Sequence, residues 1–310
     1  MISIVLPAFN EEDNLIPILN KIEEVMGNVQ DPFEIILVDD GSTDHTLEKI
    51  KERGLKDPRI KYISLSRNFG HQNALKAGLD YAKGDAVISM DADMQHPPEL
   101  ILDFLKKWKE GYDVVYSIRM DDPNLGFAKR TSSKGFYKII NSLSDIQIEA
   151  GAADFRLMDR KVVNVLSNLN ENELFIRGLV SWIGFKQIGI EYIPGRRIAG
   201  QSKYTFSKMI RLGIQGITSF SIRPLYLATY LGIGFSVLSI LLYVPYILIS
   251  FFSGNVVSGW SSVLATVVFL GGLQLMILGI IGIYLGKLFM QSKGRPRYII
   301  GQTNIKEYDH

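Results

Sequence analysis

The sequence of 310 residues contains no cysteine, which excludes a disulfide framework and any metal site built on thiolates. It also lacks the glycine-rich patterns Gly-x-Gly-x-x-Gly and Gly-x-x-x-x-Gly-Lys-(Ser/Thr), which are typical of dinucleotide-binding dehydrogenases and P-loop NTPases. The formal net charge is only +2, so the composition does not indicate a nucleic-acid partner. Phosphate groups on a substrate would have to be met by a metal ion and by basic side chains.

Charged residues are absent from one long stretch. Between Pro224 and Gly286 there is no Asp, Glu, Lys, Arg or His. A run of about 20 apolar residues can cross a bilayer, so we predict two transmembrane helices within residues 224–290. Lys and Arg precede the first span and follow the second, and the turn between the spans has none, which predicts that the charged N-terminal domain and both termini lie in the cytoplasm. The alternative is a buried helical hairpin, which would be unusual for so long an uncharged stretch.

The first 120 residues alternate short apolar runs with segments of helical pattern. The predicted strands are Ile2–Leu6, Glu34–Val38, Ile60–Leu65, Asp85–Met90 and Asp113–Ser117. This alternation is typical of βαβ units and predicts an α/β domain with a Rossmann-like, mostly parallel sheet. In such sheets, ligands bind beyond the carboxyl ends of the strands.

Polar clusters follow four of these strands, and the central cluster is Asp91-Ala92-Asp93. Two carboxylates so close together repel each other unless a positive charge lies between them. A hard divalent cation with oxygen ligands meets that need, and Mg²⁺ sites typically combine one or two carboxylates with substrate phosphates. The sequence therefore predicts a site for Mg²⁺ or Mn²⁺ with a diphosphate. The alternative is a solvated turn whose acids cap the next helix.

Three motifs in order carry a resemblance to a known family. They are Val-Leu-Pro-Ala-Phe-Asn-Glu-Glu at 5–12, Val-Asp-Asp-Gly-Ser-Thr-Asp at 38–44 and Met-Asp-Ala-Asp-Met-Gln-His-Pro-Pro-Glu at 90–99. Together they resemble the inverting family-two glycosyltransferases with a GT-A fold. Within that family they resemble the polyprenyl-phosphate branch, which contains dolichol-phosphate mannose synthases and bactoprenol glucosyltransferases. The resemblance implies a nucleotide-sugar donor, a divalent metal and a lipid-phosphate acceptor.

The resemblance also implies roles for individual residues. Metal ligands would be Asp91, Asp93 and Gln95. Contacts to the nucleotide sugar would come from Pro7, Ala8, Asn10, Glu11, Asp39, Asp40, Asp91, Ala92, Arg197 and Lys203. The acceptor phosphate would be bound by Arg119, Arg130 and Ser133. Arginine suits that role because its planar fork matches phosphate oxygens, although a basic cluster of this kind is also common as a solvated face.

Asp154 completes the expected catalytic set, together with Asp93, Arg119 and Arg130. The segment 151–157 around it is similar to one in the bactoprenol branch. A phosphate monoester has its second pKa near ~6, so the acceptor is already largely ionised and needs little help from a base. We therefore favour a positioning or electrostatic role for Asp154 over general-base catalysis. A structural pair with Arg156 is the alternative.

The expected organisation is a catalytic domain at 1–203, interfacial amphipathic helices at 204–223, a transmembrane hairpin at 224–290 and a C-terminal tail at 291–310. The expected reaction transfers a hexose, most simply glucose from UDP-glucose, to undecaprenyl phosphate. By the resemblance the protein is a homo-oligomer such as a tetramer. Alternatives are a mannose or aminosugar transferase, a membrane scaffold with a decayed transferase domain, and a processive polysaccharide synthase. A processive synthase generally needs more spans and a Gln-x-x-Arg-Trp segment, which this sequence does not contain.

Overall fold

A computed structural model describes the chain except for residues 121–148, 150, 172–173, 194–217, 254–258 and 306–310. The described residues belong to two compact units. One holds the described residues up to Ile193 together with those from Arg295 onward. The other holds the described residues between Thr218 and Gly294.

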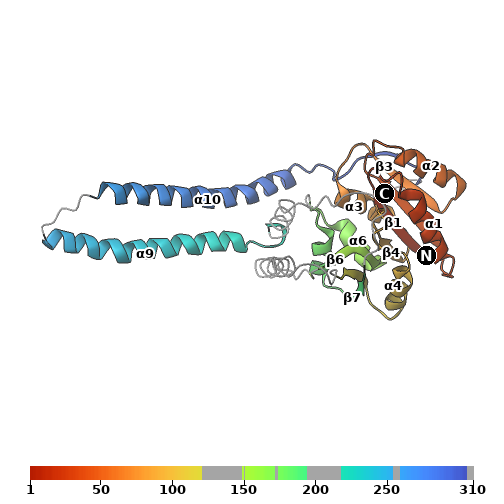
Figure 1. Ribbon diagram of the computed structural model, residues 1–310, viewed down its shortest axis with the longest axis horizontal. Helices are drawn as coiled ribbons and strands as arrows, with labels where there is room; N and C mark the ends of the chain where they lie inside the picture. The colour runs from red at the N-terminus through yellow and green to blue at the C-terminus, as the bar shows by residue number, and fades with distance from the viewer. Residues whose placement is uncertain (121–148, 150, 172–173, 194–217, 254–258, 306–310) are drawn as a thin grey trace. The chain divides into compact units, whose positions relative to one another are not determined.

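The first unit is an α/β domain built on one sheet. Its elements are β1 (Ile2–Ala8), α1 (Leu15–Met26), β2 (Phe33–Asp39), α2 (Thr46–Lys56), β3 (Ile60–Leu65), α3 (His71–Tyr81), β4 (Ala86–Ser89), α4 (Leu100–Lys109), β5 (Val114–Arg119), β6 (Ala152–Asp159), α6 (Arg160–Asn168), α7 (Ile176–Ile183), β7 (Gln187–Tyr192) and β8 (Ile300–Thr303) (Figure 1). The strand order across the sheet is β7-β5-β6-β4-β1-β2-β3-β8.

The expected α/β architecture is confirmed, and each of the five predicted strands is present within a few residues of its expected bounds. The sheet is more mixed than the pattern indicated. Strands β1, β2, β3 and β4 are parallel, as βαβ units require, but β6 runs antiparallel between β4 and β5. Strand β8 adds a second antiparallel pairing on β3.

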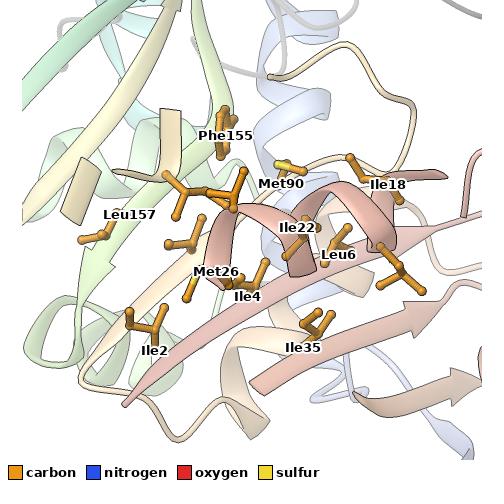
Figure 2. Packing of buried hydrophobic residues seen from close by; sticks show 14 of the residues in the cluster. Ile2, Ile4, Leu6, Ile18, Ile22, Met26, Ile35, Met90, Phe155 and Leu157 are labelled. Atoms are coloured by element: carbon orange, nitrogen blue, oxygen red, sulfur yellow. The ribbon is translucent and has the colours of Figure 1, made fainter. Parts of the chain in front are cut away.

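The central strands form because their side chains are buried on both faces. Every residue of β1 is buried, which explains why its sequence is a continuous apolar run rather than an alternating one. Helix α1 covers one face with Leu15, Ile18, Ile22 and Met26, spaced three or four residues apart along one side of the helix. Figure 2 shows Ile18, Ile22 and Met26 packed against the strands, with Phe155 and Leu157 of β6 in the same cluster.

The segment after residue 294, expected as a tail, contributes the edge strand β8 to this sheet. Arg297 donates to the backbone carbonyls of Leu169 and Glu171, and the Tyr298 hydroxyl donates to Asp80 at 2.9 Å. Pairing by β8 also covers the exposed edge of β3. The C-terminal segment is therefore part of the domain.

The second unit contains two long helices, α9 (Arg223–Ser253) and α10 (Trp260–Ser292). They lie side by side (Figure 1), with Phe235 and Phe269 in an edge-on ring contact at 5.4 Å between centroids. Among the described residues one segment, Phe269–Ser292, is long and apolar enough to cross a membrane. The second predicted span stays a prediction. Most of the expected amphipathic segment at 204–223 lies outside the described residues.

Gly78 lets α3 approach the sheet closely. A Cβ atom at this position would lie 2.2 Å from a methyl carbon of Val5 and 3.0 Å from one of Val38. Both valines are fully buried and cannot swing away. Gly78→Ala is therefore expected to destabilise the domain by about 1–3 kcal/mol through overpacking.

The measurement is the thermal unfolding midpoint of the full chain. Gly54→Ala is the matched control, since its Cβ would meet nothing nearer than 3.3 Å. Equal midpoints for the Gly78 and Gly54 variants would contradict this packing argument.

Candidate active site

Two loops at the carboxyl ends of β1 and β2 are bonded to each other. The backbone N–H of Asn10 donates to the Ser42 hydroxyl at 3.0 Å, and Asn10 Oδ1 accepts from the Thr43 N–H at 2.8 Å. The Glu11 N–H donates to the Thr46 hydroxyl at 2.9 Å. Asn10 has a positive φ of 55°, a conformation that asparagine tolerates better than most residues. The loops expected to frame the nucleotide are thus one connected structure.

Asp39 and Asp40 are both buried at the end of β2. Asp39 accepts hydrogen bonds from the Ser42 N–H at 3.0 Å and from the Ser64 hydroxyl at 2.9 Å. Asp40 accepts from the backbone N–H groups of Phe69 and Gly70, at 2.7 and 3.0 Å. Burial raises the pKa of Asp40, although these two donors oppose the rise. Both carboxylates therefore hold neighbouring loops at the carboxyl end of β2.

The hydrogen bonds that Asp40 accepts from Phe69 and Gly70 fix the loop that precedes α3. Gly41, with φ of +70°, packs against the backbone of Arg67, where a Cβ atom would lie 2.6 Å from the Arg67 carbonyl carbon. Only glycine allows this approach at this backbone conformation. The loop in turn sets the position of His71, the first residue of α3.

Asp91 lies between two histidines. His71 Nε2 is 3.3 Å from Asp91 Oδ1, and His96 Nε2 is 3.3 Å from Asp91 Oδ2. Nδ1 of His96 is 2.9 Å from the hydroxyl of Tyr192, the last residue of β7. Desolvation acts to raise the pKa of Asp91, but the His96 hydrogen bond and the His71 charge outweigh it and lower the pKa. Asp91 is therefore held as a carboxylate.

Asp93 and Gln95 form the next part of the site. Asp93 Oδ1 accepts from the Gln95 N–H at 3.1 Å, and the Gln95 side-chain amide contacts the other Asp93 oxygen. Arg119, at the end of β5, donates to Gln95 Oε1 at 3.4 Å. Met94 has a positive φ of 62°, which is strained for a non-glycine residue. Within the part of the chain that the structure describes, no group of three or more His, Cys, Asp or Glu side chains is arranged to hold a metal ion.

Asp154 is the centre of a buried charge cluster. Its Oδ1 lies 3.0 Å from Arg177 Nε and 3.6 Å from Arg156 Nη2. Its Oδ2 accepts from Gln72 Nε2 at 3.2 Å and lies 3.8 Å from His71 Nε2. Asp154 and Arg156 are 6% and 3% exposed, so both charges depend on this pairing for stability.

This cluster shifts the proton affinities of its members. Burial acts to raise the pKa of Asp154, but the charge of Arg177, the nearby His71 ring and the charge of Arg156 hold it well below its usual range. Desolvation acts to lower the pKa of His71, yet the close carboxylate of Asp154 and the charge of Asp91 raise it to about 9. An aspartate with so little affinity for a proton is a poor general base.

The structure brings together most of the site residues expected from the sequence. Those described are Pro7, Ala8, Asn10, Glu11, Asp39, Asp40, Asp91, Ala92, Asp93, Gln95, Arg119 and Asp154, all at the carboxyl ends of β1, β2, β4 and β5 or the start of β6. Four others, Arg130, Ser133, Arg197 and Lys203, lie outside the described residues.

Five residues at the site were missed by the sequence reasoning, namely His71, Gln72, His96, Arg177 and Tyr192. Two signals were available. His96 belongs to the motif at 90–99, and His71 directly follows the polar loop after β3. Arg177 and Tyr192 had none, because their approach depends on how α7 and β7 pack.

Comparison with known proteins shows the family of the chain. Residues 3–166 match the family described as "Glycosyl transferase family 2". The chain belongs to glycosyl transferase family 2. An "Uncharacterized glycosyltransferase YkcC" of Bacillus subtilis is 44% identical, over 97% of this chain and 93% of the relative. A "Bactoprenol glucosyl transferase" of Shigella phage SfV is 40% identical, over 98% of this chain and 99% of the relative.

Among solved structures, this family 2 chain is similar to a mannosyltransferase from Pyrobaculum calidifontis in complex with GDP-Man and Mn²⁺. That protein is 15% identical, with a TM-score of 0.49, and the match covers 94% of this chain and 86% of the other.

Proposed function

We propose that this glycosyltransferase transfers a hexose, glucose from UDP-glucose, to undecaprenyl phosphate with inversion of the anomeric carbon. The observation that carries the proposal is one site in which Asp91 and Asp93, the Asp154 cluster and Arg119 converge at the carboxyl ends of the strands. Relatives named bactoprenol glucosyl transferase, which match nearly the whole chain, support the lipid acceptor.

On the donor side, the connected loops after β1 and β2 would hold the nucleotide. We assign the nucleobase to Asp39 or Asp40, each of which accepts two protein hydrogen bonds and keeps further lone pairs on its oxygens. Backbone groups from Pro7 to Glu11 would frame the ribose and base. Arg197 and Lys203 are proposed to neutralise the diphosphate, a role that rests on the sequence alone.

The residues of the Asp91–Gln95 segment suit a divalent metal. Two carboxylates and one amide supply only oxygen donors of the kind that Mg²⁺ and Mn²⁺ prefer. A diphosphate would supply the further ligands that the described protein residues do not. When bound, the cation would offset the negative charge that develops on the leaving nucleoside diphosphate. We assign Asp91, Asp93 and Gln95 to hold it.

On the acceptor side, we assign the lipid phosphate to Arg119, with Arg130 and Ser133 from the sequence. Arg119 already contacts Gln95, so a phosphate bound to its guanidinium would lie close to the donor diphosphate. The acceptor arrives ionised and needs no strong base. Asp154 then acts by fixing Arg177, Arg156 and His71 rather than by taking a proton.

A lipid acceptor requires a membrane-bound enzyme. We propose that both α9 and α10 span the bilayer, since each is long enough and the stretch from Pro224 to Gly286 is free of charge. Basic residues flank the pair on one side, which favours a cytoplasmic active site and cytoplasmic termini. A homo-oligomer stays a prediction from the sequence.

The proposal is tested by a panel of labelled donors. Membranes containing the protein are incubated with undecaprenyl phosphate and UDP-glucose, GDP-mannose or UDP-N-acetylglucosamine, and the lipid products are separated by thin-layer chromatography. Label from UDP-glucose is expected in the lipid product. Label from GDP-mannose or UDP-N-acetylglucosamine instead would move the assignment to a mannose or aminosugar transferase. Release of free sugar with no lipid product would overturn transfer to a lipid.

A further inference from the structure

Tyr192 and His96 form a buried chain of contacts that ends on Asp91. The Tyr192 hydroxyl lies 2.9 Å from His96 Nδ1, and His96 Nε2 lies 3.3 Å from Asp91 Oδ2. Tyr192 and His96 are 6% and 7% exposed, so water does not compete for these groups. His96 is also packed between the rings of Phe155 and Tyr192, at centroid distances of 5.3 and 5.7 Å.

The direction of the two hydrogen bonds follows from the chemistry of the groups. A carboxylate oxygen accepts hydrogen bonds, so in the 3.3 Å contact with Asp91 Oδ2 the donor is His96 Nε2. In an imidazole with a single proton, Nδ1 is then an acceptor, and it requires a donor. The hydroxyl of Tyr192 is that donor. Burial and the charges of Asp91 and Asp93, against the opposing effect of Arg119, raise the pKa of Tyr192 to about 12, which keeps this hydroxyl protonated.

The other oxygen of Asp91 faces a similar arrangement. His71 lies 3.3 Å from Asp91 Oδ1 and 3.8 Å from Asp154 Oδ2, so it is anchored by a second acid. Each oxygen of Asp91 therefore contacts one histidine. His96 also contacts the buried Tyr192, and His71 lies near the buried Asp154. A carboxylate held in this way keeps one orientation toward the donor site.

We propose that Tyr192 is a positioning residue for the donor site: its hydroxyl fixes the orientation of His96, which in turn orients the Asp91 carboxylate toward the metal-bound diphosphate of the nucleotide sugar. This inference rests on the proposed function. Tyr192 pairs with Arg119 at the ends of β7 and β5. The inference therefore adds β7, for which the sequence predicted no site residue, to the elements that build the donor site.

Tyr192→Phe tests the inference because it removes one hydroxyl and keeps the ring. Removing a partner that orients a metal ligand typically weakens binding by about 10- to 100-fold. We expect the apparent Kd of the full-length protein for Mn²⁺ in the presence of UDP to rise by about tenfold. Binding is measured from the electron paramagnetic resonance signal of free Mn²⁺, which needs no turnover.

Tyr298→Phe is the matched control. It also removes a hydroxyl that donates to a carboxylate, the partly buried Asp80, but next to β8 at the other edge of the sheet. Both variants are expected to lose some thermal stability, and only Tyr192→Phe is expected to weaken Mn²⁺ binding with UDP. Unchanged Mn²⁺ affinity in folded Tyr192→Phe would overturn the positioning role.

Replacing His96 gives an independent test should Tyr192→Phe fail to fold. The amide nitrogen of glutamine lies near the place of Nε2, whereas that of asparagine lies near Nδ1. His96→Gln is therefore expected to keep more of the Mn²⁺ affinity than His96→Asn, and equal affinities would contradict the inference. If the wild-type protein itself binds no Mn²⁺ with UDP, the donor assignment fails and the inference fails with it.

Discussion

Replacing Asp93 with Asn is expected to reduce sugar transfer by about a thousandfold, the effect of losing a group that stabilises charge in the transition state. The geometry explains the size of this effect. Asp93 contacts Gln95, and Gln95 in turn contacts Arg119. Asp93 therefore lies close to the residues assigned to the donor diphosphate and to the residue assigned to the acceptor phosphate. Asparagine keeps the shape of the side chain and removes the charge, and the fold should survive.

The control for this change is Asp103→Asn, an exposed acid on α4. Initial rates of lipid-linked product formation are compared for both variants and the wild type, with the thermal midpoint recorded for each. Addition of EDTA to the wild type should produce a loss similar to that of Asp93→Asn. A wild-type rate that survives EDTA would contradict the metal assignment, and an active Asp93→Asn enzyme would contradict the role of the carboxylate.

Replacing Asp154 with Asn is expected to have the second-largest effect, this time on stability as well as activity. Arg156 is 3% exposed and is paired with Asp154, and burial lowers its pKa to about 10 despite that pairing. Removing the acid leaves a buried positive charge without compensation, which typically costs about 3–5 kcal/mol. It also releases Arg177 and His71 from their common partner.

Glu34→Gln is the control that separates the loss of stability from the loss of transfer activity. Glu34 is another buried acid, paired with Lys61 on β3 and remote from the site loops. Both variants should unfold at lower temperature, but only Asp154→Asn should lose transfer activity per folded molecule. Equal activity of the two folded variants would reduce Asp154 to a purely structural residue.

The pH dependence distinguishes positioning from general-base catalysis. The pKa of Asp154 in the folded state lies below the ordinary value of 3.8, so its stabilising effect is complete above about pH 4 and is lost only as the pH falls further. Between pH 6 and 8 its charge is therefore constant. In the variant His71 also loses a contribution that raises its pKa, so the ratio of variant to wild-type rate should stay flat or fall as the pH rises over that range. Recovery of the variant as the pH rises would instead indicate that Asp154 acts as a base.

The first half of the fold was predictable because its strands are buried on both faces. Strands such as β1 and β2 are short and mainly apolar, a pattern typical of a parallel sheet covered on both faces. Strand β6 was not predictable in this way. It pairs antiparallel with both β4 and β5, and its partners precede it by more than thirty residues along the chain. Strand β8 is only four residues long and lies at an edge.

The topology of the sheet decides which parts of the site are predictable from the sequence. Asp39, Asp91 and Asp93 directly follow predicted parallel strands, so their convergence follows from the topology. The approach of Asp154 to His71 and Asp91 follows instead from the antiparallel register of β6, in which Arg156 pairs with Ser89. No local pattern encodes that register. The donation from Tyr192 to His96 likewise needs three-dimensional packing.

The most direct test of the account is transfer to a lipid phosphate by the purified full-length protein. UDP-[¹⁴C]glucose and Mn²⁺ are supplied with either undecaprenyl phosphate or undecaprenol, and label is measured in the butanol-extractable fraction. We predict label with undecaprenyl phosphate, none with undecaprenol, and a β-linked product from the α-linked donor. Equal labelling of both lipids, or an α-linked product, would contradict attack by a lipid phosphate in a single inverting displacement.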